Sequence, residues 1–284
     1  MSSSADGDPT PGLPERVPSK AEGRRVLDLL RVMERLRGPE GCPWDREQTH
    51  QSLARHLLEE VHETIEAIDS GDAERLREEL GDLLLQVVFH AEMARQEGTF
   101  DMDDVAEAIT SKLIRRHPHV FGETEVSGAA DVLVNWERIK REEKGEHAVD
   151  EEIPSTLPAL ARAAKVQRRA AGEGFDWRSA AGALGKVREE LAELEAEIHG
   201  LPEERASRTK IPPERVEDEL GDLLFAVASV GRRLNVDPET ALRKATRRFA
   251  ERFERMKAEA RAEGLGLNEL SDEELIERFR SGPR

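Results

Sequence analysis

Hydrophobic residues recur at intervals of three or four along most of the chain, and this spacing predicts α-helices. Two neighbouring stripes of this kind consist of Leu53, Leu57, Val61, Ile65 and Ile68, and of Leu76, Leu80, Leu83 and Val87. Gly71 and Asp72 lie between the stripes, so we expect two long helices joined by a tight break.

Three more helices are expected in this half of the chain. The first covers residues 22–37 and ends at Gly38 and Pro39. The second covers residues 101–116 and is stopped by Pro118, and the third covers residues 130–144.

The second half repeats the pattern of the first. Its stripes consist of Leu184, Val187, Leu191, Leu194 and Ile198, and of Val216, Leu220, Leu223, Val227 and Val230, before a long helix over residues 238–263. The letters repeat too, since EEVHE at 59–63 matches EELAE at 189–193, and EELGDLLLQV at 78–87 matches DELGDLLFAV at 218–227. The chain therefore contains a duplication.

The predicted fold is all-α, a tandem repeat of antiparallel helical-bundle modules. We expect a disordered N-terminal tail over residues 1–21, an N-terminal domain over 22–145, a linker over 146–158 and a C-terminal domain over 159–284. A length of 284 residues is enough for two domains with separate cores.

The composition supports an all-α fold and makes some classes of binding partner unexpected. Aromatic residues make up only 4% and charged residues 36%, which favours helices over a β-sandwich or barrel. The net charge of −17 makes nucleic acid an unexpected partner. No apolar run approaches the roughly 18 residues of a membrane span, and the single cysteine, Cys42, fits a reducing compartment. We therefore expect a cytoplasmic protein.

Acidic residues form pairs three positions apart on the long helices. The pairs are Glu60 with Glu63 and Glu79 with Asp82 in the first copy, and Glu190 with Glu193 and Glu219 with Asp222 in the second. Each pair lies on one helix face, so two antiparallel helices can bring four carboxylates around one small volume. Such oxygen ligands favour Mg²⁺, or Mn²⁺, over zinc. One pair alone would be an ordinary solvated helix face.

A glycine inside each second helix makes the signal more specific. Gly81 and Gly221 each lie between the Glu and the Asp of a pair. A glycine inside a helix costs about 1 kcal/mol relative to alanine, and the missing side chain permits a backbone or a ligand to approach closely there.

These motifs resemble a known family. EExxE, EELGDLLxQVVFHA, KLxRRHPHVFG and NWERIKREEKG are similar to the two-domain MazG proteins, over residues 24–284. The resemblance implies an all-α nucleoside triphosphate pyrophosphatase fold with Mg²⁺ held by the ExxE and ExxD carboxylates. It also implies hydrolysis of nucleoside triphosphates to monophosphates and pyrophosphate, by a homodimer.

The residues themselves are compatible with that chemistry. Cleavage between the α- and β-phosphates needs in-line attack by water and neutralisation of the leaving pyrophosphate, and two or more Mg²⁺ ions supply both. Glu189 or Glu59, each beside the ligand pairs, is the candidate general base.

The two copies differ in their basic residues. Lys186 precedes Glu190 by one helical turn, whereas His56 occupies the matching place in the first copy. Downstream, Arg248 and Arg252 lie one turn apart, and their counterparts are Arg116 and Val120, with Pro118 between them.

A polyphosphate site needs cations as well as metals, so we predict that the C-terminal copy is catalytic. Its predicted catalytic residues are Glu189, Glu190, Glu193, Glu219 and Asp222, of which the last four are the metal ligands. The predicted substrate-binding residues are Lys186, Arg215, Arg248 and Arg252; the resemblance implies nucleotide contacts for all of these except Arg215. The N-terminal set, Glu59, Glu60, Glu63, Glu79 and Asp82, is predicted to be weak or silent.

One position departs from the family pattern. MazG proteins resemble each other in a tryptophan near the C-terminal end, where this chain has Ile276. We therefore expect loose base selectivity, suited to removal of unwanted nucleotides or to control of nucleotide levels.

Two alternatives remain. A di-iron carboxylate bundle would use an ExxH pair such as Glu59 with His62, but the second copy has Ala192 at the matching position. A non-catalytic helical scaffold or regulator would leave its acidic faces solvated. The intact second set of carboxylates beside Lys186 argues against it.

Overall fold

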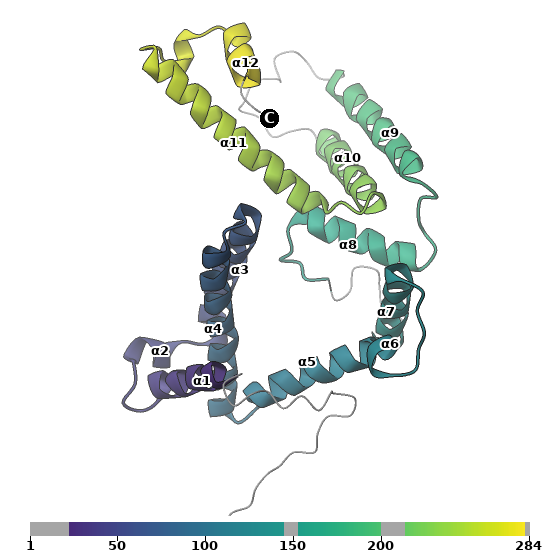
Figure 1. Cartoon of the computed structure of the whole chain (residues 1–284). Coiled ribbons are helices and arrows are strands. Elements are labelled where there is room, and N and C mark those ends of the chain that lie inside the picture. Colours follow the sequence, from purple (N-terminus) through teal and green to yellow (C-terminus); the bar gives the residue numbers. More distant parts are fainter. Residues whose placement is uncertain (1–22, 145–152, 200–213, 282–284) are drawn as a thin grey trace, which may run out of the picture. The chain divides into compact units, whose positions relative to one another are not determined.

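The described part of the chain is α-helical and falls into two compact units, Met1–Glu143 and Lys144–Arg284 (Figure 1). This computed structural model describes residues 23–144, 153–199 and 214–281. The prediction of an all-α fold is confirmed for these residues. The predicted tail and residues 146–152 of the predicted linker lie outside them. None of the described helices combines the length and the apolar character needed to cross a membrane.

Unit 1 contains α1 to α7. Their bounds are α1 (Arg24–Arg37), α2 (Pro43–Glu47), α3 (His50–Ser70), α4 (Ala73–Glu97), α5 (Met102–Arg116), α6 (Pro118–Phe121) and α7 (Ala129–Lys144). Unit 2 contains α8 (Ala159–Gly172), α9 (Ala180–His199), α10 (Glu214–Arg233), α11 (Pro238–Ala262), the 3-10 turn η2 (Leu267–Glu269) and α12 (Asp272–Ser281).

The α3–α4 hairpin follows directly from its capping residues. Thr49 caps the first amides of α3 by accepting from the backbone N–H of Ser52. Gly71 ends the helix with φ of 73°, a left-handed conformation that favours glycine. Asp72 then caps α4 by accepting from the backbone N–H groups of Glu74 and Arg75. The predicted break at Gly71 and Asp72 is confirmed.

Unit 1 builds its core from large side chains. The buried set is Met33, Leu53, Val88, Phe89 and Met93, contributed by α1, α3 and α4. Next to this core the carboxylate of Glu92, 8% exposed, accepts from Arg95 at 2.7 and 2.8 Å and from Gln96 at 2.8 Å. The buried charge is therefore fully hydrogen-bonded.

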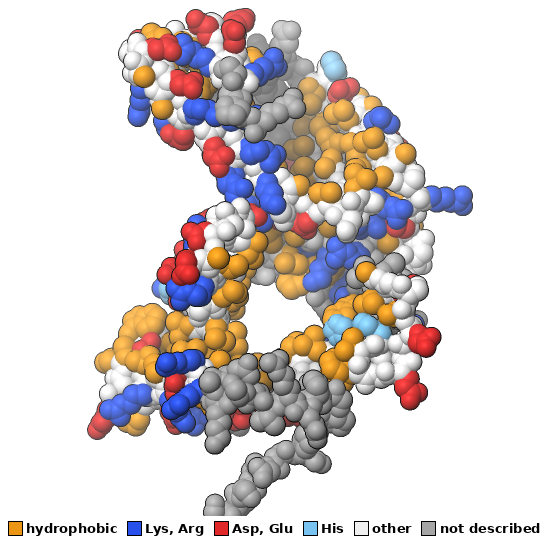
Figure 2. All heavy atoms as spheres, in the orientation of Figure 1, with side chains coloured by type: hydrophobic (Ala, Val, Ile, Leu, Met, Phe, Trp, Pro, Cys, Tyr) orange, Lys and Arg blue, Asp and Glu red, His pale blue; other side chains and the backbone are white. Residues whose placement is uncertain are grey.

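Unit 2 builds its core from small side chains. Its buried residues on α8 to α11 include Ala164, Ala183, Ala226, Ala228, Met256 and Ala260. Alanines let the helices approach closely, and the Gln167 amide of α8 donates to the Phe225 carbonyl of α10 at 2.7 Å. Large apolar side chains remain exposed on α9 and α10, where Figure 2 shows hydrophobic groups gathered; they include Leu184, Leu191, Ile198, Leu220, Leu224, Phe225 and Val227.

Ion pairs connect the C-terminal end of α10 to the residue Asp176 that precedes α9. The Asp176 carboxylate, before α9, accepts from Arg232, and from Arg233 at 3.0 Å. These two arginines lower the pKa of Asp176, with the hydrogen bond from Arg232 the largest cause. In the repeat, Arg232 occupies the place of Glu92 in unit 1. The two units therefore place charges of opposite sign at one equivalent position, where Glu92 is buried and Arg232 is partly buried.

Some helices were not expected from the sequence. Pro118 begins the short helix α6 as well as ending α5, because proline is tolerated in a first helical turn. The helices α2, α8 and α12 were also missed. Their stretches are short or rich in alanine and arginine, so their apolar period is weak.

Candidate functional site

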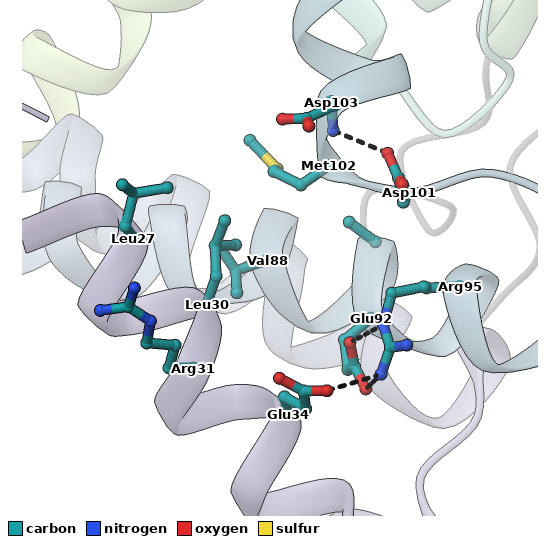
Figure 3. Close-up of a pocket in the computed structure, with 11 residues that line it drawn as sticks. Leu27, Leu30, Arg31, Glu34, Val88, Glu92, Arg95, Asp101, Met102 and Asp103 are labelled. Atoms are coloured by element: carbon teal, nitrogen blue, oxygen red, sulfur yellow. Dashed lines mark hydrogen bonds and ion pairs between the residues drawn. The ribbon is translucent and has the colours of Figure 1, made fainter. Parts of the chain in front are cut away.

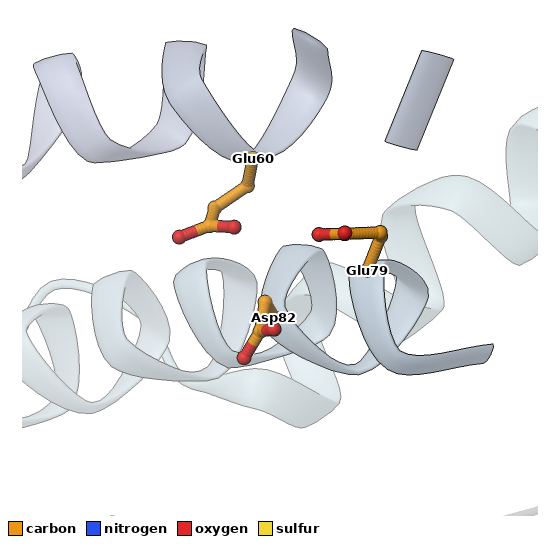
Figure 4. Close-up of side chains that lie close together, drawn as sticks. All are labelled: Glu60, Glu79 and Asp82. Atoms are coloured by element: carbon orange, nitrogen blue, oxygen red, sulfur yellow. The ribbon is translucent and has the colours of Figure 1, made fainter. Parts of the chain in front are cut away.

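Three carboxylates meet across the α3–α4 hairpin of unit 1. Glu60 extends from α3 toward Glu79 and Asp82 on α4, as Figure 4 shows. One oxygen from each residue lies within 4.8 Å of the others. We call this set the first trio. Its members are close enough for their charges to interact strongly.

Electrostatic strain is visible in the first trio. The pKa of Glu60 is raised, first by burial and then by the neighbouring charges of Asp82, Glu63 and Glu79. One basic side chain offsets it, because Arg75 lies 3.4 Å from Glu79 and 3.1 Å from Glu66. Arg75 is therefore held between a trio member and a carboxylate outside the trio.

Unit 2 repeats the arrangement on α9 and α10. Oxygens of Glu190, Glu193 and Glu219 lie within 4.8 Å of one another, and we call this set the second trio. Glu190 is 4% exposed, whereas Glu193 is on the surface. Lys186 Nζ lies 2.5 Å from a Glu190 oxygen and 2.7 Å from a Glu189 oxygen. The lysine therefore compensates the buried carboxylate.

The charges of the second trio also affect one another. The pKa of Glu193 is raised, first by burial, then by its hydrogen bond with Glu190 and by the charges of Glu190 and Glu219. The pKa of Lys186 is raised in turn by its hydrogen bonds to Glu189 and Glu190. The site thus holds more negative charge than its one lysine balances.

Both trios fit a hard divalent cation. Their donor sets consist of carboxylates, the ligands that Mg²⁺ and Mn²⁺ prefer. Two oxygens on one Mg²⁺ are at most about 4.2 Å apart, so small side-chain movements would close each set around an ion. No imidazole joins either trio among the described residues. The histidine ligand of the di-iron alternative, His62, lies exposed on α3.

Not every predicted ligand joins a trio. The sequence predicted four carboxylates in each cluster, but Glu63 lies outside the first trio and Asp222 outside the second. Both side chains are exposed. The two candidate bases lie beside the trios: Glu59 is 3.0 Å from His56 Nδ1, and Glu189 pairs with Lys186.

The predicted substrate-binding arginines have separate positions. Arg215 lies 3.3 Å from Glu197, so it links α10 to α9 through a carboxylate that is not a member of the second trio. On α11, Arg248 is exposed and Arg252 lies 6.0 Å from the ring centre of Phe279. Of the predicted phosphate contacts, Lys186 is the one that the structure brings to a trio carboxylate.

The glycines next to the trios face open space. A side-chain carbon placed on Gly81 or Gly221 would meet no described atom within 4 Å. No described backbone therefore makes the close approach that these glycines permit, and their faces stay open. Approach of a ligand there stays a prediction.

Arg75 is the site residue that the sequence reasoning missed. It precedes Glu79 by four residues, a spacing at which opposite charges on a helix meet. That signal was present in the sequence. Its partner Glu66 lies on another helix, and the sequence alone does not place it.

A cavity of unit 1 lies apart from the trios. It has a volume of about 280 Å³ between α1, α4 and the start of α5, and Leu30, Val88 and Met102 line it, as Figure 3 shows. Glu34 and Glu92 at its edge are both paired with Arg95. The cavity therefore combines apolar walls with charged groups of both signs, in contrast to the acidic trios.

Sequence comparisons identify related proteins. The family described as MazG nucleotide pyrophosphohydrolase domain matches residues 48–121, which include the first trio. A nucleoside triphosphate pyrophosphohydrolase/pyrophosphatase MazG of Thermotoga maritima is 47% identical over 260 residues, 91% of this chain and 95% of that protein. A nucleoside triphosphate pyrophosphohydrolase of Escherichia coli K12 is 44% identical over 253 residues, 88% of this chain and 93% of that protein.

A solved structure is also similar in part. A mazG-related protein from Thermotoga maritima aligns with 41% of this chain and 99% of its own length, at 28% sequence identity and a TM-score of 0.36. That score is too low to define a shared arrangement of the helices.

Proposed function

Because this chain belongs to the MazG family, we propose that it hydrolyses nucleoside triphosphates to nucleoside monophosphates and pyrophosphate. The reaction depends on Mg²⁺, with Mn²⁺ as a substitute, and the second trio is the working site. Selectivity among bases is loose, because Ile276 stands at the position of the family's tryptophan. The substrate is therefore defined by its triphosphate.

The observation that carries this proposal is Lys186 at the second trio. A triphosphate brings several negative charges to a place already crowded with carboxylates. Only a site that combines cations with oxygen ligands will accept it. Lys186, 2.5 Å from buried Glu190, provides a basic side chain within reach of whatever the trio binds.

Each residue of the second trio has a role in this scheme. Glu190, Glu193 and Glu219 hold the divalent ions, with Asp222 one turn beyond Glu219 as a further ligand. The ions supply charge neutralisation at the phosphates and activation of water. Lys186, which pairs with Glu189 and Glu190, would contact phosphate oxygens of a bound triphosphate. Glu189, one residue before the ligand Glu190, would accept the proton of the attacking water.

The proposal includes a homodimer. The large apolar side chains on α9 and α10 support it, because the unit's own small-residue core leaves them exposed. A symmetric second copy would cover such a face. Light scattering at micromolar concentration should give at least twice the chain mass of 31.8 kDa, and a monomer mass would contradict this part. The free cysteine, Cys42, supports a cytoplasmic location.

Product identification tests the reaction directly. A panel of normal and altered nucleoside triphosphates with Mg²⁺ should give monophosphate and pyrophosphate in equal amounts. Orthophosphate with diphosphate as the products would show a phosphatase instead. Full activity after exhaustive EDTA treatment would remove the metal from the proposal.

A further inference from the structure

Two histidines outside the carboxylate trios meet between α3 and α4. The Nδ1 atoms of His50 and His90 lie 2.7 Å apart. The ring planes differ by 7°, and the ring centres are 4.9 Å apart. Because the nitrogens are much closer than the ring centres, the rings face each other edge to edge. This is the geometry of a hydrogen bond between two imidazoles.

The surroundings determine where the protons lie. One of the two facing nitrogens must carry a proton and the other must be bare. His90 Nε2 is buried without a hydrogen-bond partner, and an orphaned buried N–H is rarer than an orphaned acceptor. We therefore assign the His90 proton to Nδ1, which donates to His50. His50 then carries its proton on Nε2, 3.9 Å from a Glu97 oxygen.

A bridging metal ion explains the pair less well. A tetrahedral ion bound to two imidazole nitrogens would hold them about 3.3 Å apart. The observed separation of 2.7 Å is clearly shorter. The contact is therefore a hydrogen bond between neutral rings.

We propose that His50 and His90 form an acid-sensitive link that fastens α3 to α4 at neutral pH and releases them when the pair takes up a proton. An added proton has two places to go, and each destabilises the folded pair. On His50 Nδ1 it removes the acceptor. On His90 Nε2 it leaves the hydrogen bond to His50 but creates a buried N–H without a partner and a buried charge. With both rings charged, two cations would face each other at hydrogen-bond distance.

The helices next to the pair carry further charged groups. Glu97 of α4 is the carboxylate nearest His50. From α1, Arg37 donates to Gln96 at 3.1 Å and lies 5.3 Å from the Phe89 ring centre, and it also donates to the Asp45 carbonyl of α2. Among these groups, Glu97 is the one that contacts the pair, because the partners of Arg37 are Gln96, the Phe89 ring and the Asp45 carbonyl. Burial remains the main cause of the lowered pKa of His90, followed by the charge of His50.

The sign of the pH effect follows from that direction. A histidine with a lowered pKa in the folded state binds fewer protons than in the unfolded state. Its link is therefore complete above the ordinary histidine pKa of about 6.5, and it weakens as the pH falls below that value. Both histidines lie on the helices of the first trio, so release loosens the hairpin that holds Glu60 beside Glu79.

Hydrogen exchange of the full chain tests the link. Amide protection in the first turns of α3, corrected for the intrinsic rate, should fall between pH 7.5 and pH 5.5. Each proton taken up changes the opening equilibrium by at most about tenfold per pH unit. In the His90→Gln variant, protection should be the same at both pH values, because glutamine does not titrate. The control variant His62→Gln, at an exposed histidine of α3, should behave like the wild type.

Two results would overturn the proposal. One is equal protection of wild-type α3 at both pH values, and the other is the wild-type loss persisting in His90→Gln. If circular dichroism shows that His90→Gln is unfolded, His50→Gln replaces it with the same expectation. In addition, the NMR signal of the His90 ring should titrate below the ordinary histidine pKa of about 6.5, because burial lowers the pKa of His90. Titration of His90 at or above that value would also reject the link.

Discussion

The first and second trios contain similar sets of carboxylates, but the basic side chains paired with them differ. Arg75 reaches Glu79 at 3.4 Å and is also bound to Glu66. Lys186 reaches Glu190 at 2.5 Å from the preceding turn of the same helix. The matching place in unit 1 is His56, which pairs with Glu59. A cluster of acids is thus preserved in both units, while the basic group near it is not.

This difference suggests what a triphosphate site requires beyond its metal ligands. The lysine has one ammonium on an unbranched chain and pairs with Glu189 and Glu190 of its own helix, so it is able to change partners. The arginine has a planar fork tied to two helices at once. Acidic clusters alone would therefore bind cations in both units, and substrate in one.

The largest expected effect comes from one ligand changed in each trio. Glu219→Gln should lower the turnover of nucleoside triphosphate by at least about a hundredfold, since a catalytic metal contributes several kcal/mol. The matched variant Glu79→Gln should retain most of the activity. Pyrophosphate release measured for both separates the trios. The reverse pattern would assign catalysis to unit 1, and equal partial losses would indicate two working sites.

Removal of the basic groups should have the next largest effect. Lys186→Met deletes a charge-assisted contact of roughly 1.5–3 kcal/mol, about ten- to over a hundredfold in kcat/KM. His56→Met, at the matching position, should change kcat/KM little. If the two variants lost activity equally, the lysine would not distinguish the two trios.

The metal affinity of the first trio should depend on Arg75. In Arg75→Gln, the loss of a half-exposed ion pair should tighten Mn²⁺ binding by up to about fivefold. Titration followed by electron paramagnetic resonance measures this, with Arg215→Gln as the control because Arg215 contacts Glu197 outside the second trio. Weaker binding in Arg75→Gln would show that the arginine supports the trio instead of competing with the ion.

Alanine substitutions at Gly81 and Gly221 distinguish an effect on helix stability from an effect on ligand binding. Gly81→Ala and Gly221→Ala should each stabilise their helix by up to about 1 kcal/mol, since the added carbon meets open space. Thermal unfolding measures that gain. A ligand that uses the space at Gly221 would be excluded by the alanine, so activity should fall in Gly221→Ala only. Unchanged activity in both would leave the glycines without a role in substrate binding.

The smallest expected effect concerns acid stability. Glu143 accepts from Arg115 and Arg116, which lower its pKa to about 2, and Asp176 is held similarly in unit 2. A lowered carboxyl pKa gives stability that is complete above the unfolded value and is lost as the pH falls through the folded value. Glu143→Gln should therefore remove part of the pH dependence of unfolding between about pH 4.5 and 2. An unchanged acid profile by circular dichroism would contradict this.

The sequence predicted the long helices well because each has a clear apolar period and strong caps. Thr49, Gly71 and Asp72 mark the ends of α3 and α4 in the sequence itself. The membership of the trios required the structure, because Glu63 and Asp222 have the same spacing in the sequence as the other ligands, yet they lie outside the first and second trio, respectively. The His50–His90 contact also escaped prediction, since forty residues separate the two positions and nothing in the QVVFHA motif that contains His90 points to His50 as its partner.

The inverted charges at Glu92 and Arg232 bear on how a duplicated chain folds correctly. Two similar halves on one chain risk exchanging helices during folding. Arg37 of α1 lies near Glu92 and interacts with its charge. If α1 packed on α10 instead, Arg37 would face Arg232, which is already paired with Asp176, so two cations would meet where α4 offers a carboxylate. The opposite charges at this equivalent position thus disfavour the exchange of helices between the two units during folding.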